Sequence, residues 1–325
     1  MNNIWIEKYR PNEFSEIIGQ DKNINMLNQM ITNGSLPHLL FHGKSGTGKT
    51  STITSIANKL YGKNKTFMLM RLDASDDRGI NTVREEIKGF ADKMTPFNNG
   101  VKLIVLDEAD SMTYDAQFAL RRIIEKYSDN TRFCLICNYE NKIIPAIKAR
   151  CVNIRFYPIK PTIIINRLKY ICDLENIIYT QDSLDTIASI SNGDLRKAIN
   201  MLQSISMMNN KISSELCYNS TGIPNPCLVQ DVFNILINTN ISYEITADYI
   251  KKHIVDEGIL LSFLCQQLTL YIIEQIKPTE LLGVKNNNKL LLIIIDMAKL
   301  ECDVAISTFN DIYIAGLISI FKKHD

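Results

Sequence analysis

The stretch that decides the fold is Gly43-Lys-Ser-Gly-Thr-Gly-Lys49-Thr50, which matches the phosphate-binding-loop pattern G-x-x-x-x-G-K-T. The apolar run Leu39-Leu-Phe41 precedes it, and a stretch of helical pattern from Ser51 to Leu60 follows it. In this context the glycines let the backbone fold around phosphates, and the helix presents its positive end to them. A chance glycine-rich turn is the alternative, and the strand before the loop and the helix after it argue against that interpretation.

This loop predicts a site for ATP and Mg²⁺. Lys49 is expected to reach the β- and γ-phosphates, and the hydroxyl of Thr50 is expected to bind the metal ion. The candidate nucleotide-binding residues of the loop are Gly43, Lys44, Ser45, Gly46, Thr47, Gly48, Lys49, Thr50 and Ser51.

The second motif is acidic. It is Leu103-Ile-Val-Leu-Asp107-Glu108-Ala-Asp110, which is typical of an aliphatic strand that ends in carboxylates. Asp107 at the strand end is placed to bind Mg²⁺ through water, and Glu108 to polarise the water that attacks the γ-phosphate. Paired acids alone often mark a solvated loop. Their position downstream of a phosphate-binding loop favours the catalytic interpretation.

Three further polar residues are candidates for the same chemistry. Asn138 ends the apolar run Phe133 to Cys137 and could orient the attacking water, although a lone Asn in that position is usually a turn former. Arg150 lies just before the next predicted strand, where it could stabilise charge on a γ-phosphate in its own site or a neighbour's. Arg196 opens a later helix, and a surface salt bridge is the alternative there.

The rhythm of the first half of the chain predicts an α/β fold. Short aliphatic runs alternate with amphipathic stretches, which is typical of a parallel sheet covered by helices on both faces. We expect strands at residues 39–42, 67–73, 102–106, 132–138 and 151–156. Pro158 and Pro161 follow the last strand and mark a hinge. The sequence therefore predicts a P-loop ATPase domain over residues 1–160.

Two helical domains are expected to follow. Apolar positions recur at helical spacing over residues 162–208, which predicts about three helices in a small helical domain at 161–224. The segment 219–226 contains Gly222, Pro224 and Pro226 and is predicted to be a linker. Residues 225–325 are helical in pattern and carry no motif, which is typical of an oligomerisation or packing module.

Composition excludes several classes of protein. The longest aliphatic run, Leu290 to Ile295, is far shorter than the roughly 20 apolar residues of a membrane helix. No secretory signal is visible, so the protein is expected to be intracellular, with its eight cysteines reduced. From Pro226 onward the chain holds 8 Lys and Arg and 12 Asp and Glu, a net charge of −4. Of the totals of 36 and 35, this leaves 28 basic and 23 acidic residues in residues 1–225, a net charge of +5. Any contact with a polyanion is therefore predicted in the front part of the chain.

Nine segments, in order from Trp5 to Ala198, resemble the small subunits of replication factor C, an AAA+ family of sliding-clamp loaders. The specific segments are the opening one, S-D-D-R-G and C-N-Y, whereas the C-terminal region resembles the family's collar domain only in length and helicity. The nine are Trp5-Ile-Glu-Lys-Tyr-Arg-Pro11, Ile17-Ile-Gly-Gln20, the phosphate-binding loop, Leu72-Asp-Ala-Ser-Asp-Asp-Arg-Gly79, Asp107-Glu-Ala-Asp110, Ala119-Leu-Arg-Arg122, Cys137-Asn-Tyr139, Arg150-Cys151 and Gly193-Asp-Leu-Arg-Lys-Ala198.

The resemblance implies an AAA+ module, a lid and a collar, assembled with other subunits as a hetero-pentamer that opens a clamp and sets it on primer-template DNA at the nucleus or another site of replication. By that likeness Asn138 and Arg196 are the first and second sensors, and Arg150 is the finger that enters the adjacent subunit's site. The implied adenine pocket is lined by Tyr9, Arg10, Pro11, Ile17 and Ile18. The family's usual Pro-Pro inside the loop is Lys44-Ser45 here, and the usual Ser before the finger is Ala149.

Two further contacts are predicted for one helix of the first domain. By resemblance the five subunits form a spiral and this helix lines its inner wall. Arg78 and Arg84 are therefore expected to face DNA phosphates, with a plain surface helix as the alternative. Ile87, Phe90 and Ala91 are expected to touch the clamp. The spacing of Ile87 and Phe90 also fits any helix packed on a sheet, so a core role is the alternative.

Two other functions fit parts of the sequence. An AAA+ branch-migration or initiator ATPase would need a DNA-binding winged-helix domain at the C-terminus, and the acidic C-terminal region argues against it. A structural ring member would bind nucleotide without turnover. The presence of Lys49, Asp107, Glu108 and Asn138 argues against that hypothesis.

Overall fold

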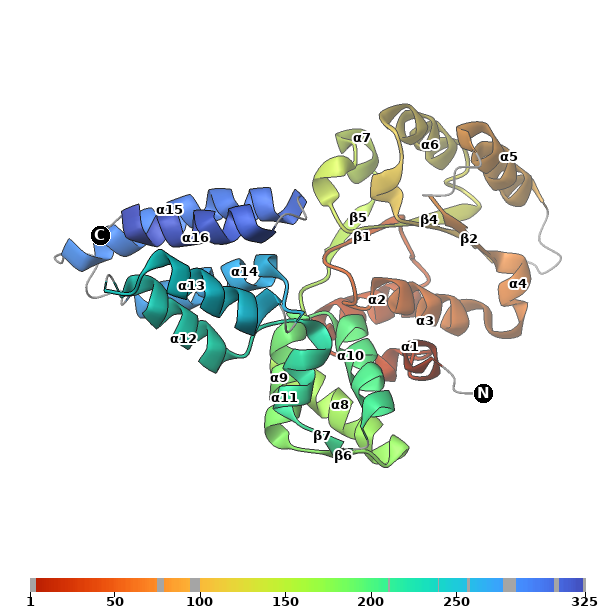
Figure 1. Cartoon of the computed structure of the whole chain (residues 1–325). Coiled ribbons are helices and arrows are strands. Elements are labelled where there is room, and N and C mark those ends of the chain that lie inside the picture. Colours follow the sequence, from red (N-terminus) through yellow and green to blue (C-terminus); the bar gives the residue numbers. More distant parts are fainter. Residues whose placement is uncertain are drawn as a thin grey trace. The chain divides into compact units, whose positions relative to one another are not determined.

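The computed structural model describes residues 4–74, 79–93, 100–209, 211–238, 240–255, 258–276, 285–306 and 310–323. The chain separates into two compact units, Met1–Lys211 and Ile212–Asp325. The first unit holds one sheet with its helices and a small helical part, and the second is helical (Figure 1).

The first unit is built on a five-stranded parallel sheet with the strand order β2-β3-β4-β1-β5. The predicted α/β class is confirmed, and each predicted strand is found within two residues of its expected ends. Strand β2 begins later than predicted, because Phe67 and Met68 belong to the short helix α4 (Lys65–Met68). The strands are β1 (Leu39–His42), β2 (Leu69–Asp73), β3 (Lys102–Asp107), β4 (Thr131–Cys137) and β5 (Val152–Arg155).

Helices cover both faces of this sheet (Figure 1). Alternate residues of a strand point to opposite faces, so β1 directs Leu40 to one core and Leu39 and Phe41 to the other. Helices α2 (Asp21–Thr32) and α3 (Lys49–Tyr61) supply side chains to the core around Leu39. The opposite core receives side chains from α5 (Gly79–Asp92), α6 (Tyr114–Lys126) and α7 (Pro145–Lys148).

Three helices follow the sheet within the first unit, as predicted: α8 (Pro161–Glu175), α9 (Gln181–Ser191) and α10 (Leu195–Met208). Local chemistry sets their ends. Pro161 starts α8, and Asn176 and Asn192 end α8 and α9 in the left-handed conformation that asparagine tolerates. A short two-stranded sheet joins β6 (Ile178–Tyr179) and β7 (Lys211–Ile212). The N-terminal helix α1 (Trp5–Lys8) packs on α10.

The second unit is helical and has its own apolar core. Helix α11 continues to Thr221 and α12 begins at Pro226, so the connection between them is shorter than the predicted linker. None of the helices in the described ranges is long and apolar enough to cross a membrane. The helices are α11 (Ser214–Thr221), α12 (Pro226–Ile237), α13 (Tyr243–Ile250), the π-helix Lys251–Val255, α14 (Leu261–Gln275), α15 (Lys285–Ile306) and α16 (Asn310–Lys323).

The described residues of the first unit also form four short 3₁₀ helices. They are Phe14–Glu16, Gly62–Asn64, Ala109–Ser111 and Glu140–Lys142. The one at Ala109–Ser111 follows β3 directly and so lies at the end of the sheet that holds the acidic motif.

Candidate active site

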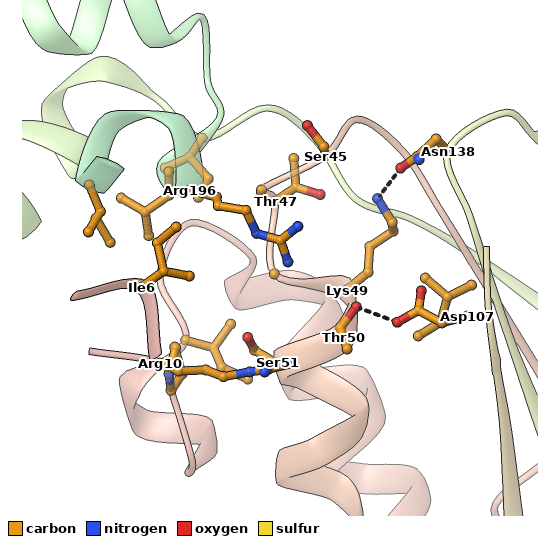
Figure 2. A pocket seen from close by; sticks show the side chains of 18 of the residues that line it. Ile6, Arg10, Ser45, Thr47, Lys49, Thr50, Ser51, Asp107, Asn138 and Arg196 are labelled. Atoms are coloured by element: carbon orange, nitrogen blue, oxygen red, sulfur yellow. Dashed lines mark hydrogen bonds between the residues drawn. The ribbon is translucent and has the colours of Figure 1, made fainter. Parts of the chain in front are cut away.

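A cavity of about 380 Å³ opens at the carboxyl ends of β1, β3 and β4 (Figure 2). This is the edge at which open parallel α/β sheets bind their ligands. Its walls come from the N-terminal segment, the phosphate-binding loop, the ends of the strands and helix α10. The lining residues include all five predicted adenine-pocket residues together with Ser45, Gly46, Thr47, Gly48, Lys49, Thr50, Ser51, Asp107, Glu108, Asn138 and Arg196.

The ammonium of Lys49 is held at the centre of the loop. Lys49 is 7% exposed and begins α3. Its Nζ donates to the carbonyl oxygens of Gly43 (2.6 Å) and Lys44 (2.8 Å) and to Oδ1 of Asn138 (2.9 Å). Burial lowers the pKa of Lys49 from its ordinary value. Figure 2 shows this lysine and Asn138 directed toward one another, so the predicted loop lysine and the predicted sensor belong to one hydrogen-bonded network.

The three acids of the second motif occupy different places. Asp107 accepts a hydrogen bond from the hydroxyl of Thr50 at 3.1 Å (Figure 2). Glu108 has φ 52° and ψ 38°, the left-handed conformation, and like Asp107 it lines the cavity. Asp110 Oδ2 accepts from the backbone N–H groups of Asn138 (3.2 Å) and Tyr139 (3.1 Å). Asp110 therefore ties the acidic loop to the neighbouring strand end that carries Asn138.

Thr50, in the first turn of α3, and Asp107, at the end of β3, fit a magnesium ion. Mg²⁺ prefers oxygen ligands, and a hydroxyl and a carboxylate lie 3.1 Å apart at Thr50 and Asp107. Within the described residues there is no cluster of three or more His, Cys, Asp or Glu side chains that could hold a metal. A metal at Thr50 and Asp107 would therefore take its remaining ligands from water and from phosphate oxygens, which is how Mg²⁺ is usually bound beside a nucleotide.

Helix α10 meets the phosphate-binding loop from the other side of the cavity. Asp194 caps this helix by accepting from the backbone N–H of Lys197 at 3.0 Å. The second oxygen of Asp194 accepts a hydrogen bond from the hydroxyl of Ser45. The backbone N–H of Leu195 donates to the carbonyl of Gly46 at 3.3 Å. These contacts place Arg196, the next residue, at the cavity wall (Figure 2).

Tyr9 joins the N-terminal wall of the cavity to helix α8. Its hydroxyl donates to Glu175 at 2.5 Å, and its carbonyl accepts from Arg167 at 3.0 Å. Burial, followed by the hydrogen bond to Glu175, raises the pKa of Tyr9. Trp5 is held on α10 by a hydrogen bond from its backbone N–H to Gln203 at 3.0 Å.

Arg150 lies away from the cavity of its own chain. It forms an ion pair with Glu125 and donates to the carbonyl of Ala146 at 2.6 Å. Glu125 also binds Arg121 at 3.1 Å, so the two arginines share one carboxylate on the outside of α6. Nothing in this arrangement brings Arg150 to the nucleotide-binding residues of the same chain.

The predicted DNA and clamp residues fall mostly outside what the structure describes or inside the core. Arg78 lies outside the described residues, and for Arg84 only the backbone of α5 is described. Ile87 and Ala91 are each 1% exposed and pack in the core on the sheet, since they face it at helical spacing. Phe90 is partly exposed. As folded here, only Phe90 of the three clamp candidates offers a side chain to a partner.

Two residues of the site were missed by sequence reasoning. Arg71 lines the cavity and binds Asp107, and Asp194 receives the hydrogen bond from Ser45. Both act through contacts with segments far away in the chain. Asp194 lies in the quoted segment Gly193-Asp-Leu-Arg-Lys-Ala198, but that segment does not indicate its contact with Ser45. The only available signal for Arg71 is that it shares a strand face with Asp73, two residues further along β2.

Comparisons with known proteins decide the family. Residues 39–159 match the ATPase family associated with various cellular activities, and residues 166–207 match the lid domain described as RCF1/5-like, AAA+ ATPase lid domain. The chain is 39% identical to mouse replication factor C subunit 5 over 98% of this chain and 91% of that protein. The chain belongs to the replication factor C subunit family.

Other relatives agree with this assignment. Human replication factor C subunit 5 is 38% identical over 98% of this chain and 91% of its own length, and Saccharomyces cerevisiae replication factor C subunit 3 is 42% identical over 72% and 70%. The recognised resemblance is confirmed, and the chain is an AAA+ ATP hydrolase of clamp-loader type.

Solved structures show the same fold in a different context. The Thermotoga maritima RuvB Holliday junction branch migration motor matches with a TM-score of 0.53 and 16% identity, over 78% of this chain and 90% of that one. At this identity the likeness supports the AAA+ fold alone, so it adds no argument for a branch-migration function.

Proposed function

We propose that this replication factor C subunit uses ATP binding and hydrolysis to open a sliding clamp and load it on primed DNA during replication. The observation that carries the proposal is that Lys49, Asp107, Glu108 and Asn138 all line one cavity in a chain of this family. A subunit with only a structural role in a ring would not need an acid at Glu108 or a sensor bonded to the loop lysine.

The residues of the cavity suggest the steps that each performs. Lys49 would exchange its carbonyl and amide partners for the β- and γ-phosphates of ATP. Thr50 and Asp107 would hold Mg²⁺, which neutralises charge on the phosphates when it is bound. Glu108 would polarise the attacking water, while Asn138, fixed in place by Asp110, orients it.

Two arginines would complete the site from different directions. Arg196 reaches the cavity from α10 and would contact the phosphates in the same chain. Arg150 is turned away from its own cavity, and we propose that it enters the ATP site of the adjacent subunit, where arginine fingers contribute about 10³ to 10⁵ in rate. In that case the ion pair with Glu125 would hold Arg150 until the neighbour is bound.

We further propose the partners and the division of the chain. Other clamp-loader subunits would form a hetero-pentamer with this chain, at the nucleus or another intracellular site of replication, and the three-domain division at 1–160, 161–224 and 225–325 describes its parts. Arg78 and Arg84 would contact primer-template DNA phosphates, which carry no base information, so each lost arginine lowers the salt slope by roughly one unit. Phe90 would contact the clamp.

The test reconstitutes the complex with the variant chain in place of wild type. Lys49→Ala should abolish nucleotide binding at this site, because it removes the charge that reaches the phosphates. Glu108→Gln should bind ATP and stall in clamp-bound complexes, since it keeps the shape and loses the base. Near-normal steady-state ATPase activity at the Glu108→Gln site would remove Glu108 from its role.

Arg150→Ala is tested in the same complex, with wild-type neighbours. Loss of hydrolysis at the adjacent subunit's site, with nucleotide bound normally at this chain's own site, is the expected result. A defect confined to this chain's own site would refute the assignment in trans.

A further inference from the structure

We propose that Arg71 is a further residue of the nucleotide site, and that its guanidinium holds Asp107 and opposes the binding of Mg²⁺ at that carboxylate. The inference rests on the proposed role of Asp107 as a metal ligand. It assigns to Arg71 a control over how much Mg²⁺ the site requires.

The geometry brings two donors to one carboxylate oxygen. Arg71 lies in β2, and its Nη2 donates to Oδ2 of Asp107 at 2.8 Å. The same oxygen accepts from the hydroxyl of Thr50 at 3.1 Å. A guanidinium therefore binds the oxygen that the hydroxyl ligand of the metal also contacts.

The pairing of β2 with β3 brings Arg71 close to Asp107. Strands β2 and β3 are parallel neighbours, and Asp73 is the register partner of Asp107. Residues i and i+2 of a strand share a face, so Arg71 and Asp73 both lie on the side of β2 that lines the cavity. Arg71 is long enough to reach forward to the last residue of β3, where the acidic motif begins.

Exposure shows which partner can move. The side chain of Asp107 is 18% exposed, whereas that of Arg71 is 45% exposed. A half-exposed ion pair contributes little to stability, so the pair is not needed to hold the sheet together. The guanidinium can swing into water at little cost, whereas Asp107 is mostly buried at the end of β3 and would then take Mg²⁺ as its cationic partner.

Two cations compete for the same oxygen. A unit charge about 5 Å from a divalent ion lowers its affinity by on the order of tenfold, even at the dielectric constant of water. Mg²⁺ would therefore bind well only when phosphates supply further negative ligands and Arg71 withdraws. This makes the metal bind together with the nucleotide and not before it.

The experiment measures the binding of a fluorescent ADP to the full-length chain by anisotropy, at Mg²⁺ concentrations from zero (with EDTA) to saturation. Arg71→Gln should lower the Mg²⁺ concentration for half of the affinity change by about tenfold, because it removes the competing charge. Arg71→Lys keeps the charge and should stay close to wild type. Lys22→Gln removes an exposed positive charge from α2 and is the matched control, for which no change is expected.

Asp107→Asn separates the two proposals. It should abolish the Mg²⁺ dependence, which supports the metal site independently of Arg71. A Mg²⁺-dependent wild type with an unchanged midpoint in Arg71→Gln overturns the inference alone. A loss of ADP affinity in EDTA for Arg71→Gln also overturns it, because Arg71 would then bind phosphate. A wild type without Mg²⁺ dependence overturns the metal site and this inference together.

Discussion

Replacing Glu108 by glycine should make the protein more stable than replacing it by alanine, although both variants lose the carboxylate that is proposed to polarise the attacking water. Glu108 has φ 52° and ψ 38°, in the left-handed region that a non-glycine residue enters at a cost of roughly 1–2 kcal/mol. Glycine avoids this cost, but it loses more entropy on folding, by roughly 0.5–1 kcal/mol relative to alanine. The expected difference in the free energy of unfolding is therefore about 1 kcal/mol in favour of glycine.

The assay is thermal unfolding of the full-length variants followed by circular dichroism. For a unit of 150–250 residues, 1 kcal/mol corresponds to about 2–4 °C in Tm. Asn166, exposed in the middle of α8, provides the control. At that helical position Asn166→Gly should be less stable than Asn166→Ala, because glycine is a poor helix former. The sign of the glycine effect thus reverses between the two sites.

Equal stability of the two Glu108 variants, or a more stable alanine variant, would refute the argument from backbone strain. The strained conformation has a functional reason. Adjacent residues of a strand point to opposite faces, yet Asp107 and Glu108 both line the cavity. The left-handed turn at Glu108 ends the strand and lets two successive carboxylates face the same cavity.

Three other outcomes follow from burial and hydrogen bonding. Ile87→Ala should cost about 2–5 kcal/mol in urea unfolding, whereas Phe90→Ala should cost less than the 3–5 kcal/mol of a fully buried Phe while weakening clamp binding. Asp110→Ala should lower kcat at this site with ATP affinity retained, and Asp110→Asn, which keeps an acceptor oxygen, should restore part of the rate. A thiol reagent should label Cys227 and Cys302 rapidly in the isolated native chain, because both are exposed. Slow labelling is expected for the thiols whose pKa burial raises to about 12: Cys137, Cys151, Cys172 and Cys265.

The sheet could be predicted because its central strands are buried on both faces. Strand β3 contains the buried apolar run Leu103–Leu106, and β4 contains the buried apolar run Phe133–Cys137. The edge strand β2 is half-exposed and carries Arg71, and it begins two residues later than the sequence predicts because Phe67 and Met68 belong to α4. Phe67 looked like part of an apolar strand, but its side chain is 61% exposed at the end of a short helix.

Most residues that line the cavity could be predicted because short-range spacing identifies them. A phosphate-binding loop is one continuous segment, and its strand and helix lie next to it in the sequence. The contacts of Arg71 and Asp194 join segments that are far apart, so no local pattern indicates them. Helical spacing likewise identifies one face of α5 but cannot say whether a sheet or a partner covers it. Burial of Ile87 and Ala91 gives the answer for this chain.

The cavity is built from the sheet domain and from the helices that follow it in the first unit. The wall at Tyr9 is bonded to α8, and the loop at Ser45 is bonded to the start of α10. A nucleotide with its base at Tyr9 and its phosphates at Lys49 would therefore touch residues whose positions depend on the helices after the sheet. A proline at this position could not donate the hydrogen bond that Ser45 makes, since proline lacks a hydroxyl. In this chain the hydroxyl of Ser45 thus couples the phosphate-binding loop to the helix that carries Arg196.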